Sequence, residues 1–248
     1  VSVVSIMAIN NETGVVNDIP ALVEVTRRHA PGAQFHTDAV QALGWIDLAA
    51  HVEDADLISI TGHKFGGPVG TGALFVRHGV ELDAQILGGG QERGRRAGTP
   101  DVAGAAAFAA AATATVAARD ADVVRLGALR DRLVVGLRDR LGEVVAPTVL
   151  DGGAPVAAGI AHVVLADVEA EALLFLLDAA GVRASAASSC SSGAQDPSHV
   201  LAAMGVDRMV AQGSLRLSLG HTTTEADIEA ALECIPPAVE RLRAHGGG

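Results

Sequence analysis

Ser59-Ile60-Thr61-Gly62-His63-Lys64-Phe65-Gly66-Gly67-Pro68 joins an apolar run to a glycine-rich turn, and its Lys64 is the only lysine of the 248-residue chain. Every other basic side chain is Arg or His. Arg cannot replace Lys where the chemistry needs a neutral amine, because a guanidinium stays protonated. An amine that forms a Schiff base is one such case. The plain alternative is a solvated surface lysine, so the neighbouring residues must decide.

Short apolar runs and helical segments alternate around this stretch. Residues 1–9, 34–37, 56–60 and 73–76 are predicted strands. A helix is predicted over residues 18–29, with Asp18 as its cap and Pro20 in its first turn. This order indicates an α/β architecture with a mostly parallel sheet.

Polar residues follow three of these strands, and ligands bind at the carboxyl ends of strands in such sheets. Asn11, Asp38 and Lys64 each occupy such an end. A lysine and a carboxylate at two strand ends fit pyridoxal phosphate (PLP), because the lysine forms a Schiff base and the carboxylate pairs with the protonated pyridine nitrogen.

Four nearby polar residues complete this hypothesis. Gln41 and Asn11 are candidates to hydrogen-bond the ring oxygen, and Thr61 and His63 to donate to the phosphate. Taken singly, Asn11 is better explained as a turn residue and His63 as an ordinary loop histidine. The glycine- and arginine-rich loop at residues 88–100 could bind an anion before the next helix, although a solvated basic loop is the somewhat better explanation of that stretch alone.

The pattern changes after residue 118. Apolar residues recur at helical spacing in residues 121–141, namely Val124, Leu126, Leu129, Leu133 and Leu137. Strands are predicted at 144–145, 159–165 and 214–219, and helices at 169–180 and 199–204. Thr224-Glu225-Ala226-Asp227 resembles a capping box that opens the last helix. Residues 119–248 are therefore predicted to form a separate small α+β domain.

Composition excludes several classes of protein. Net charge is −11, with 29 acidic residues against 18 Lys and Arg, so a nucleic-acid partner is not expected. Two cysteines are too few for a disulfide framework and favour a reducing compartment. Residues 1–9 lack the features of a signal peptide, and residues 102–118, rich in Ala and Thr, favour a packed helix over a membrane span. We predict a cytoplasmic protein without a membrane partner or a metal site.

Six blocks, in this order along almost the whole chain, resemble the cysteine desulfurases, most closely the branch that supplies iron–sulfur cluster assembly. The blocks are NNETG at 10–14, HTDAVQ at 36–41, TGHK at 61–64, GGQERGRRAGT at 89–99, SSCSS at 188–192 with DPSHVL at 196–201, and SLRLSLG at 214–220. Any single block would be weak, but six in order are a strong signal.

The resemblance implies a fold-type-I PLP enzyme, similar to aspartate aminotransferase, that acts as a homodimer. Residues 1–118 would be the remainder of the PLP-binding large domain, and residues 119–248 the small domain that carries a catalytic cysteine loop. The implied reaction converts L-cysteine to L-alanine and leaves the sulfur on an enzyme cysteine as a persulfide. A sulfur-acceptor or scaffold protein is the implied partner.

Matched position by position, the resemblance assigns a role to each candidate residue. The assigned roles are Schiff-base lysine for Lys64, pyridinium partner for Asp38, ring-oxygen contacts for Asn11 and Gln41, phosphate contacts for Thr61 and His63, a contact with the partner subunit's phosphate for Thr99, substrate carboxylate for Asn11 and Arg216, and nucleophile for Cys190. A guanidinium fork suits a carboxylate, and the small residues around Cys190 suit a segment that must approach another protein. Cys234, in an amphipathic helix, is expected to be structural.

The chain departs from the family pattern in two ways. The family begins well before the position of Val1, and that part supplies another phosphate loop and a histidine that stacks on the ring. We expect either a fragment or a missing piece on another chain. Thr61 replaces the usual Ser and keeps the hydroxyl. The alternatives are another PLP-dependent C–S or C–Se lyase of the same fold, and a truncated interaction module without catalysis.

Overall fold

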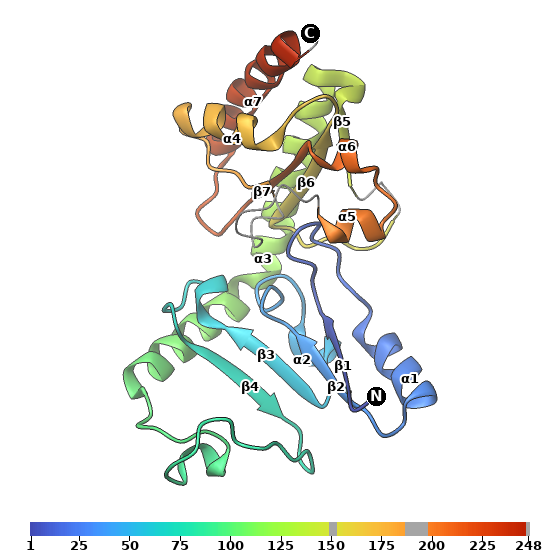
Figure 1. The fold of residues 1–248 in the computed structure, drawn as a ribbon. Helices are drawn as coiled ribbons and strands as arrows, with labels where there is room; N and C mark the ends of the chain where they lie inside the picture. Colours follow the sequence, from blue (N-terminus) through green and yellow to red (C-terminus); the bar gives the residue numbers. More distant parts are fainter. Residues whose placement is uncertain (149–152, 187–197, 247–248) are drawn as a thin grey trace. The chain divides into compact units, whose positions relative to one another are not determined.

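The computed structural model describes residues 1–248 except 149–152, 187–197 and 247–248 (Figure 1). The chain divides into two compact units. The first comprises Val1–Ile9 and Asn17–Asp120, and the second comprises Asn10–Val16 and Ala121–Gly248. The short loop Asn10–Val16 thus groups with the second unit, although the residues on both sides of it belong to the first.

The first unit is built on a four-stranded sheet in the order β1-β2-β3-β4. The strands are β1 (Val3–Met7), β2 (Gln34–Asp38), β3 (Leu57–Thr61) and β4 (Gly72–Val76). β1 and β2 run parallel to each other, as do β2 and β3, and their register pairs Met7 with Asp38 and Asp38 with Ser59. The predicted strands are confirmed, and the parallel part of the sheet brings the ends of β2 and β3 to one edge.

β4 pairs with β3 in the antiparallel sense, with Thr61 opposite Gly72. Parallel pairing needs a crossover of about a dozen residues or more, usually with a helix. The connection from β3 to β4 is shorter and consists of the 3₁₀ turn η1 (Gly62–Lys64) and a glycine-rich loop. The sheet is therefore mostly parallel, as predicted, with an antiparallel strand at its edge.

Helix α1 (Ile19–His29) contacts β2, and Ile19 and Val23 of the helix are buried, as is Phe35 of the strand (Figure 1). Its start follows the prediction, because the Asp18 carboxylate accepts a hydrogen bond from the Ala21 N–H at 3.1 Å. The one-turn helix α2 (Leu48–His51) precedes β3 and was not predicted.

Helix α3 (Val102–Leu141) is continuous over 40 residues, and the division between the two units falls inside it, after Asp120. The charged pair Arg119 and Asp120 interrupts the apolar pattern, but neither residue breaks a helix as Pro or Gly would. Arg119 donates to the Ile46 carbonyl at 3.2 Å and pairs with Asp120 at 3.0 Å. The predicted apolar stripe holds except for Val124, which is exposed, whereas Leu126, Leu129, Leu133 and Leu137 are buried.

The second unit has a three-stranded antiparallel sheet in the order β5-β6-β7. Its strands are β5 (Val145–Pro147), β6 (Ile160–Leu165) and β7 (Ser214–Ser218). The helices are α4 (Ala170–Ala179), α5 (His199–Ala203), α6 (Arg208–Ala211) and α7 (Glu225–Gly246), of which α4 contacts α7 and α6 contacts β6. The predicted capping box opens α7, since the Asp227 carboxylate accepts from both the N–H and the hydroxyl of Thr224 at 2.8 Å.

The segment Val102–Val144, which holds α3, is long and apolar enough to cross a membrane by length and composition alone. Its most apolar window has a mean hydropathy of 1.4 and is not buried within the chain. One such helix is weak evidence, because core helices of soluble proteins meet the same criterion.

Candidate active site

Asp38 ends β2 at the carboxyl edge of the first unit's sheet and is half-buried. Its Oδ1 accepts a hydrogen bond from the Val40 N–H at 3.0 Å. Among the described residues no Arg, Lys or His side chain forms an ion pair with Asp38. The carboxylate is therefore held in place by the backbone, and no cation of the described residues neutralises its charge.

Lys64 ends η1, directly after β3, at the same edge of the sheet. Its side chain is exposed, and within the described part of the chain its amine forms no ion pair. The turn that presents it depends on Gly62, because a Cβ there would lie 2.4 Å from the Thr71 hydroxyl oxygen. The Phe65 and Phe108 rings, 5.2 Å apart and edge to face, pack beside this turn. Close packing thus fixes the turn that carries Lys64, and the amine of this lysine is free of ion pairs with the described residues.

Thr61 and His63, the predicted phosphate ligands, contact each other. The Thr61 hydroxyl donates to the Thr71 carbonyl at 3.0 Å and lies 3.1 Å from His63 Nδ1. The Thr61 hydroxyl has one proton, which it donates to the Thr71 carbonyl. The imidazole Nδ1 must therefore be the donor in its contact with Thr61. Nε2 of the same ring then faces away from this pair.

Gln41 and Thr99 belong to the same unit. Gln41 is half-buried three residues after Asp38. Thr99 is exposed in the loop before α3, next to Gly98, whose backbone takes a φ of +120°. Neither side chain has a described hydrogen bond that would assign it a role, so both roles stay predictions.

The loop Asn10–Val16 belongs to the second unit and is tightly organised. Asn10 Oδ1 accepts from the N–H groups of Glu12 and Thr13, both at 2.9 Å. Gly14 takes a φ of +78°, and a Cβ there would lie 3.0 Å from the side chains of Ile160 and Val156. These bonds hold the half-buried Asn11 at the tip of the loop, with its backbone carbonyl available.

Arg216 lies on β7 in the same unit, and its Nη1 donates to the Asn11 carbonyl at 2.8 Å. Its backbone N–H and C=O both bond to Ser185, at 2.7 and 3.1 Å. Among the described residues no carboxylate pairs with Arg216, and its buried Nε has no hydrogen-bond partner. A cation with unused donors and no anion is suited to bind a carboxylate ligand.

Sequence reasoning missed three polar residues of this unit, and each is buried. The Ser198 hydroxyl donates to the buried Glu12 carboxylate and accepts from the N–H groups of Val200 and Leu201, so it caps α5. His162 is the single polar residue of the buried strand β6, which was the signal available in the sequence. Burial and the charge of Arg216 lower the pKa of His162 from 6.5 to about 4.

Cys190, the predicted nucleophile, lies outside the described residues. Cys234 is partly exposed on α7. Within the described ranges, no group of three or more His, Cys, Asp or Glu side chains is arranged to hold a metal ion.

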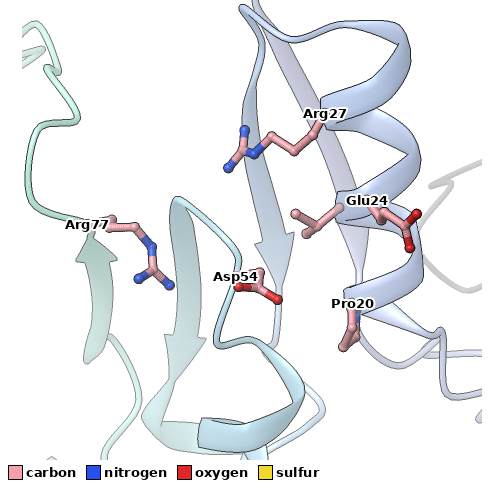
Figure 2. A pocket seen from close by; sticks show the side chains of 6 residues that line it. Pro20, Glu24, Arg27, Asp54 and Arg77 are labelled. Carbon is pink, nitrogen blue, oxygen red and sulfur yellow. The ribbon is translucent and has the colours of Figure 1, made fainter.

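A shallow hollow of about 400 Å³ lies beside α1 in the first unit (Figure 2). It is lined by Pro20, Val23, Glu24, Arg27, Asp54 and Arg77. Arg27 is occupied by Asp56 at 2.7 Å, and Arg77 Nε by the Ala55 carbonyl at 2.9 Å. The hollow contains none of the predicted site residues and no nucleophile, so it is separate from the lysine and its carboxylate.

The model of the aminotransferase class-V family matches residues 1–231. The chain belongs to this family. Among curated relatives of this class-V chain, the "IscS-like cysteine desulfurase" of Mycobacterium tuberculosis is 46% identical over 98% of the chain and 61% of that protein. The "Cysteine desulfurase" of Gluconacetobacter diazotrophicus is 42% identical over 98% of the chain and 59% of that protein.

Solved structures agree with the class-V fold. A "NIFS-LIKE PROTEIN" superposes with a TM-score of 0.85 at 32% identity, over 97% of this chain and 61% of that one. The NifS-like protein from Rickettsia africae gives 0.84 at 30% identity, over 96% and 62%. The chain therefore spans about three fifths of the length of these class-V relatives.

Class-V enzymes of this kind depend on PLP, and the residues of this class-V chain fit that cofactor. A pyridinium nitrogen needs an unpaired carboxylate, and Asp38 has no cation partner among the described residues. A Schiff base needs a free amine at the same edge, which Lys64 has. The hydroxyl–imidazole pair of Thr61 and His63, close before the amine in the sequence, is chemically suited to the cofactor phosphate.

Proposed function

We propose that the protein containing this chain is a PLP-dependent cysteine desulfurase that converts L-cysteine to L-alanine and takes the sulfur as a persulfide. The observation that carries the proposal is the free amine of Lys64 at the same sheet edge as the unpaired Asp38 carboxylate. The names of the relatives, at 46% and 42% identity, support the reaction.

Each residue has a defined part in this proposal. Bound PLP supplies an electron sink for the carbon skeleton of the substrate. Lys64 attaches the cofactor, Asp38 holds the proton of its ring nitrogen, and Thr61 with His63 holds its phosphate. Asn11 and Gln41 bind its ring oxygen.

Residues of the second unit bind the substrate and remove its sulfur. Arg216, together with Asn11, binds the carboxylate of L-cysteine. The Cys190 thiolate attacks the substrate sulfur, so an S–S bond forms while the C–S bond breaks. The carbon that leaves with the electron pair takes up a proton and becomes the methyl group of L-alanine.

The wider setting is proposed on the same basis. We infer a homodimer in which Thr99 contacts the partner subunit's phosphate, and a sulfur-acceptor or scaffold protein that receives the sulfur for iron–sulfur cluster assembly or another sulfur-transfer route. The low cysteine content supports a reducing, cytoplasmic location.

The test uses the full-length protein, with any sequence that precedes Val1 included. We expect the visible absorbance band of bound PLP to disappear in Lys64→Ala, and sulfide and alanine release from L-cysteine to disappear in Cys190→Ser. Cys234→Ser is the matched control, since it removes the other cysteine of the chain and should leave both signals unchanged.

The possible results separate the alternatives. A PLP band with sulfur release that does not depend on Cys190 would indicate a C–S or C–Se lyase instead. A protein that binds no PLP would overturn the enzyme proposal and favour an interaction module.

A further inference from the structure

β6 is buried along its whole length, yet it contains His162, which is only 5% exposed. The imidazole uses both of its nitrogens. Nδ1 contacts the Thr148 hydroxyl, and Nε2 lies 2.8 Å from the Ser214 hydroxyl. A hydroxyl can donate or accept, so both contacts are satisfied by a neutral ring.

His162 is placed directly opposite Arg216 in the antiparallel pairing of β6 with β7. Directly opposed residues of an antiparallel pair point to the same face, with their Cβ atoms about 5 Å apart. Ser214 precedes Arg216 by two residues and therefore shares that face. The histidine, its hydroxyl partner and the arginine thus form one row in the second unit.

Within the described ranges, the groups that form hydrogen bonds with Arg216 are uncharged. Its described partners are the Asn11 carbonyl and, through the backbone, Ser185. The facing titratable group is His162, which burial and the arginine's own charge keep neutral by lowering its pKa to about 4. The hydroxyls of Thr148 and Ser214 do not ionise. The row therefore places no opposite charge across the strands from the arginine.

We propose that His162 is a positioning residue for Arg216: an uncharged, doubly hydrogen-bonded ring that fixes the arginine for a substrate carboxylate without competing with that carboxylate. This inference rests on the proposed function, in which Arg216 binds L-cysteine. A carboxylate in place of the ring would pair with the guanidinium across the strands. An aliphatic residue would leave the hydroxyl of Ser214 without its partner.

A pair of variants of equal size isolates the charge. His162→Gln keeps a neutral polar side chain beside Ser214, whereas His162→Glu differs from it only by a carboxylate. In the full-length holoenzyme we expect His162→Glu to raise the KM for L-cysteine about tenfold or more, as a competing charge-assisted bond would, with kcat changed less than about twofold. His162→Gln should stay within about threefold of the wild-type KM.

Coupling is measured by repeating both variants in an Arg216→Ala background. The KM difference between Gln and Glu at position 162 should disappear there, because the charge has lost its partner. A difference that persists, or a loss confined to kcat, would overturn the proposal. Thermal unfolding and the PLP absorbance of each variant show whether it folds and holds cofactor. If the Glu variant does not fold, the same test compares His162→Asn with His162→Asp.

The failure of this inference differs from the failure of the proposed function. If the wild-type protein released no sulfur, the function would fall, and the variants would then be compared by their dissociation constants for L-alanine. An equal affinity of the Gln and Glu variants for L-alanine would overturn the role of His162 as well. A tenfold weaker affinity of the Glu variant would support it without the reaction.

Discussion

Lys64 and Arg216, the two cations of the candidate site, have no carboxylate partner in the parts of the chain that the structure describes. Lys64 lies on a turn that Gly62 makes possible, and Arg216 lies opposite a neutral histidine. At both positions the surroundings leave a positive group available to a ligand.

The buried histidine also has a consequence for stability. The pKa of His162 is lowered from 6.5 to about 4 in the folded protein, chiefly by burial and secondly by Arg216. Between these values the unfolded chain binds a proton that the folded chain does not, so stability must fall as the pH drops from 6.5 toward 4. The full difference amounts to roughly 3 kcal/mol, and little further loss from this group follows below pH 4.

The measurement is the free energy of unfolding in urea as a function of pH, for the wild type and His162→Gln. The difference between the two proteins should change by roughly 3 kcal/mol between pH 7 and pH 4, because Gln does not titrate. Parallel pH dependences would show that His162 titrates normally. His29, which is exposed on α1, supplies a control substitution that should leave the slope unchanged.

At the scale of the element, the turn after β3 is the part most exposed to single substitutions. Gly62→Ala places a methyl group 2.4 Å from the Thr71 hydroxyl oxygen, closer than any real contact, so the turn must shift. We expect PLP to bind at least about tenfold more weakly, which is a loss of roughly 1.4 kcal/mol of binding free energy. The reason is that the lysine amine and the Thr61–His63 pair move together with the turn.

Gly32→Ala is the matched control, because a Cβ at that position meets nothing within 4 Å. PLP affinity is measured by absorbance titration of both variants of the full-length protein. Equal affinities would show that the turn tolerates a side chain and that its geometry does not hold the lysine.

Much of the first unit could be predicted from the sequence, because its strands are short apolar runs with clear ends. The edge that gathers Asp38 and Lys64 follows directly from the strand order. The continuity of α3 could not be read from the sequence, since a change of apolar pattern at a domain boundary occurs equally in a loop and, as here, within one helix. Glu12, Ser198 and His162 were missed because their roles depend on partners distant in the sequence, as the bond between Glu12 and Ser198 illustrates.

At the scale of the whole molecule, apolar side chains remain on the surface. Leu74 and Phe75 on β4 of the first unit are 51% and 53% exposed.

We therefore expect residues 1–248 expressed alone to associate or to bind a hydrophobic dye, because large exposed apolar patches mark surfaces that another chain segment covers. Light scattering and dye fluorescence of residues 1–248 are the measurements. A monodisperse monomer without dye binding would contradict the expectation.

The polypeptide passes between its two units three times: after Ile9, after Val16 and after Asp120. No single cut in the backbone can separate them into complete parts. A fragment that starts at Ala121 would lack the carbonyl of Asn11 that Arg216 binds and the carboxylate of Glu12 that Ser198 binds. Gene truncation or splitting at the apparent domain boundary should therefore yield a damaged second half, and only a polypeptide that regains the loop Asn10–Val16, for instance by circular permutation, would carry both anchors.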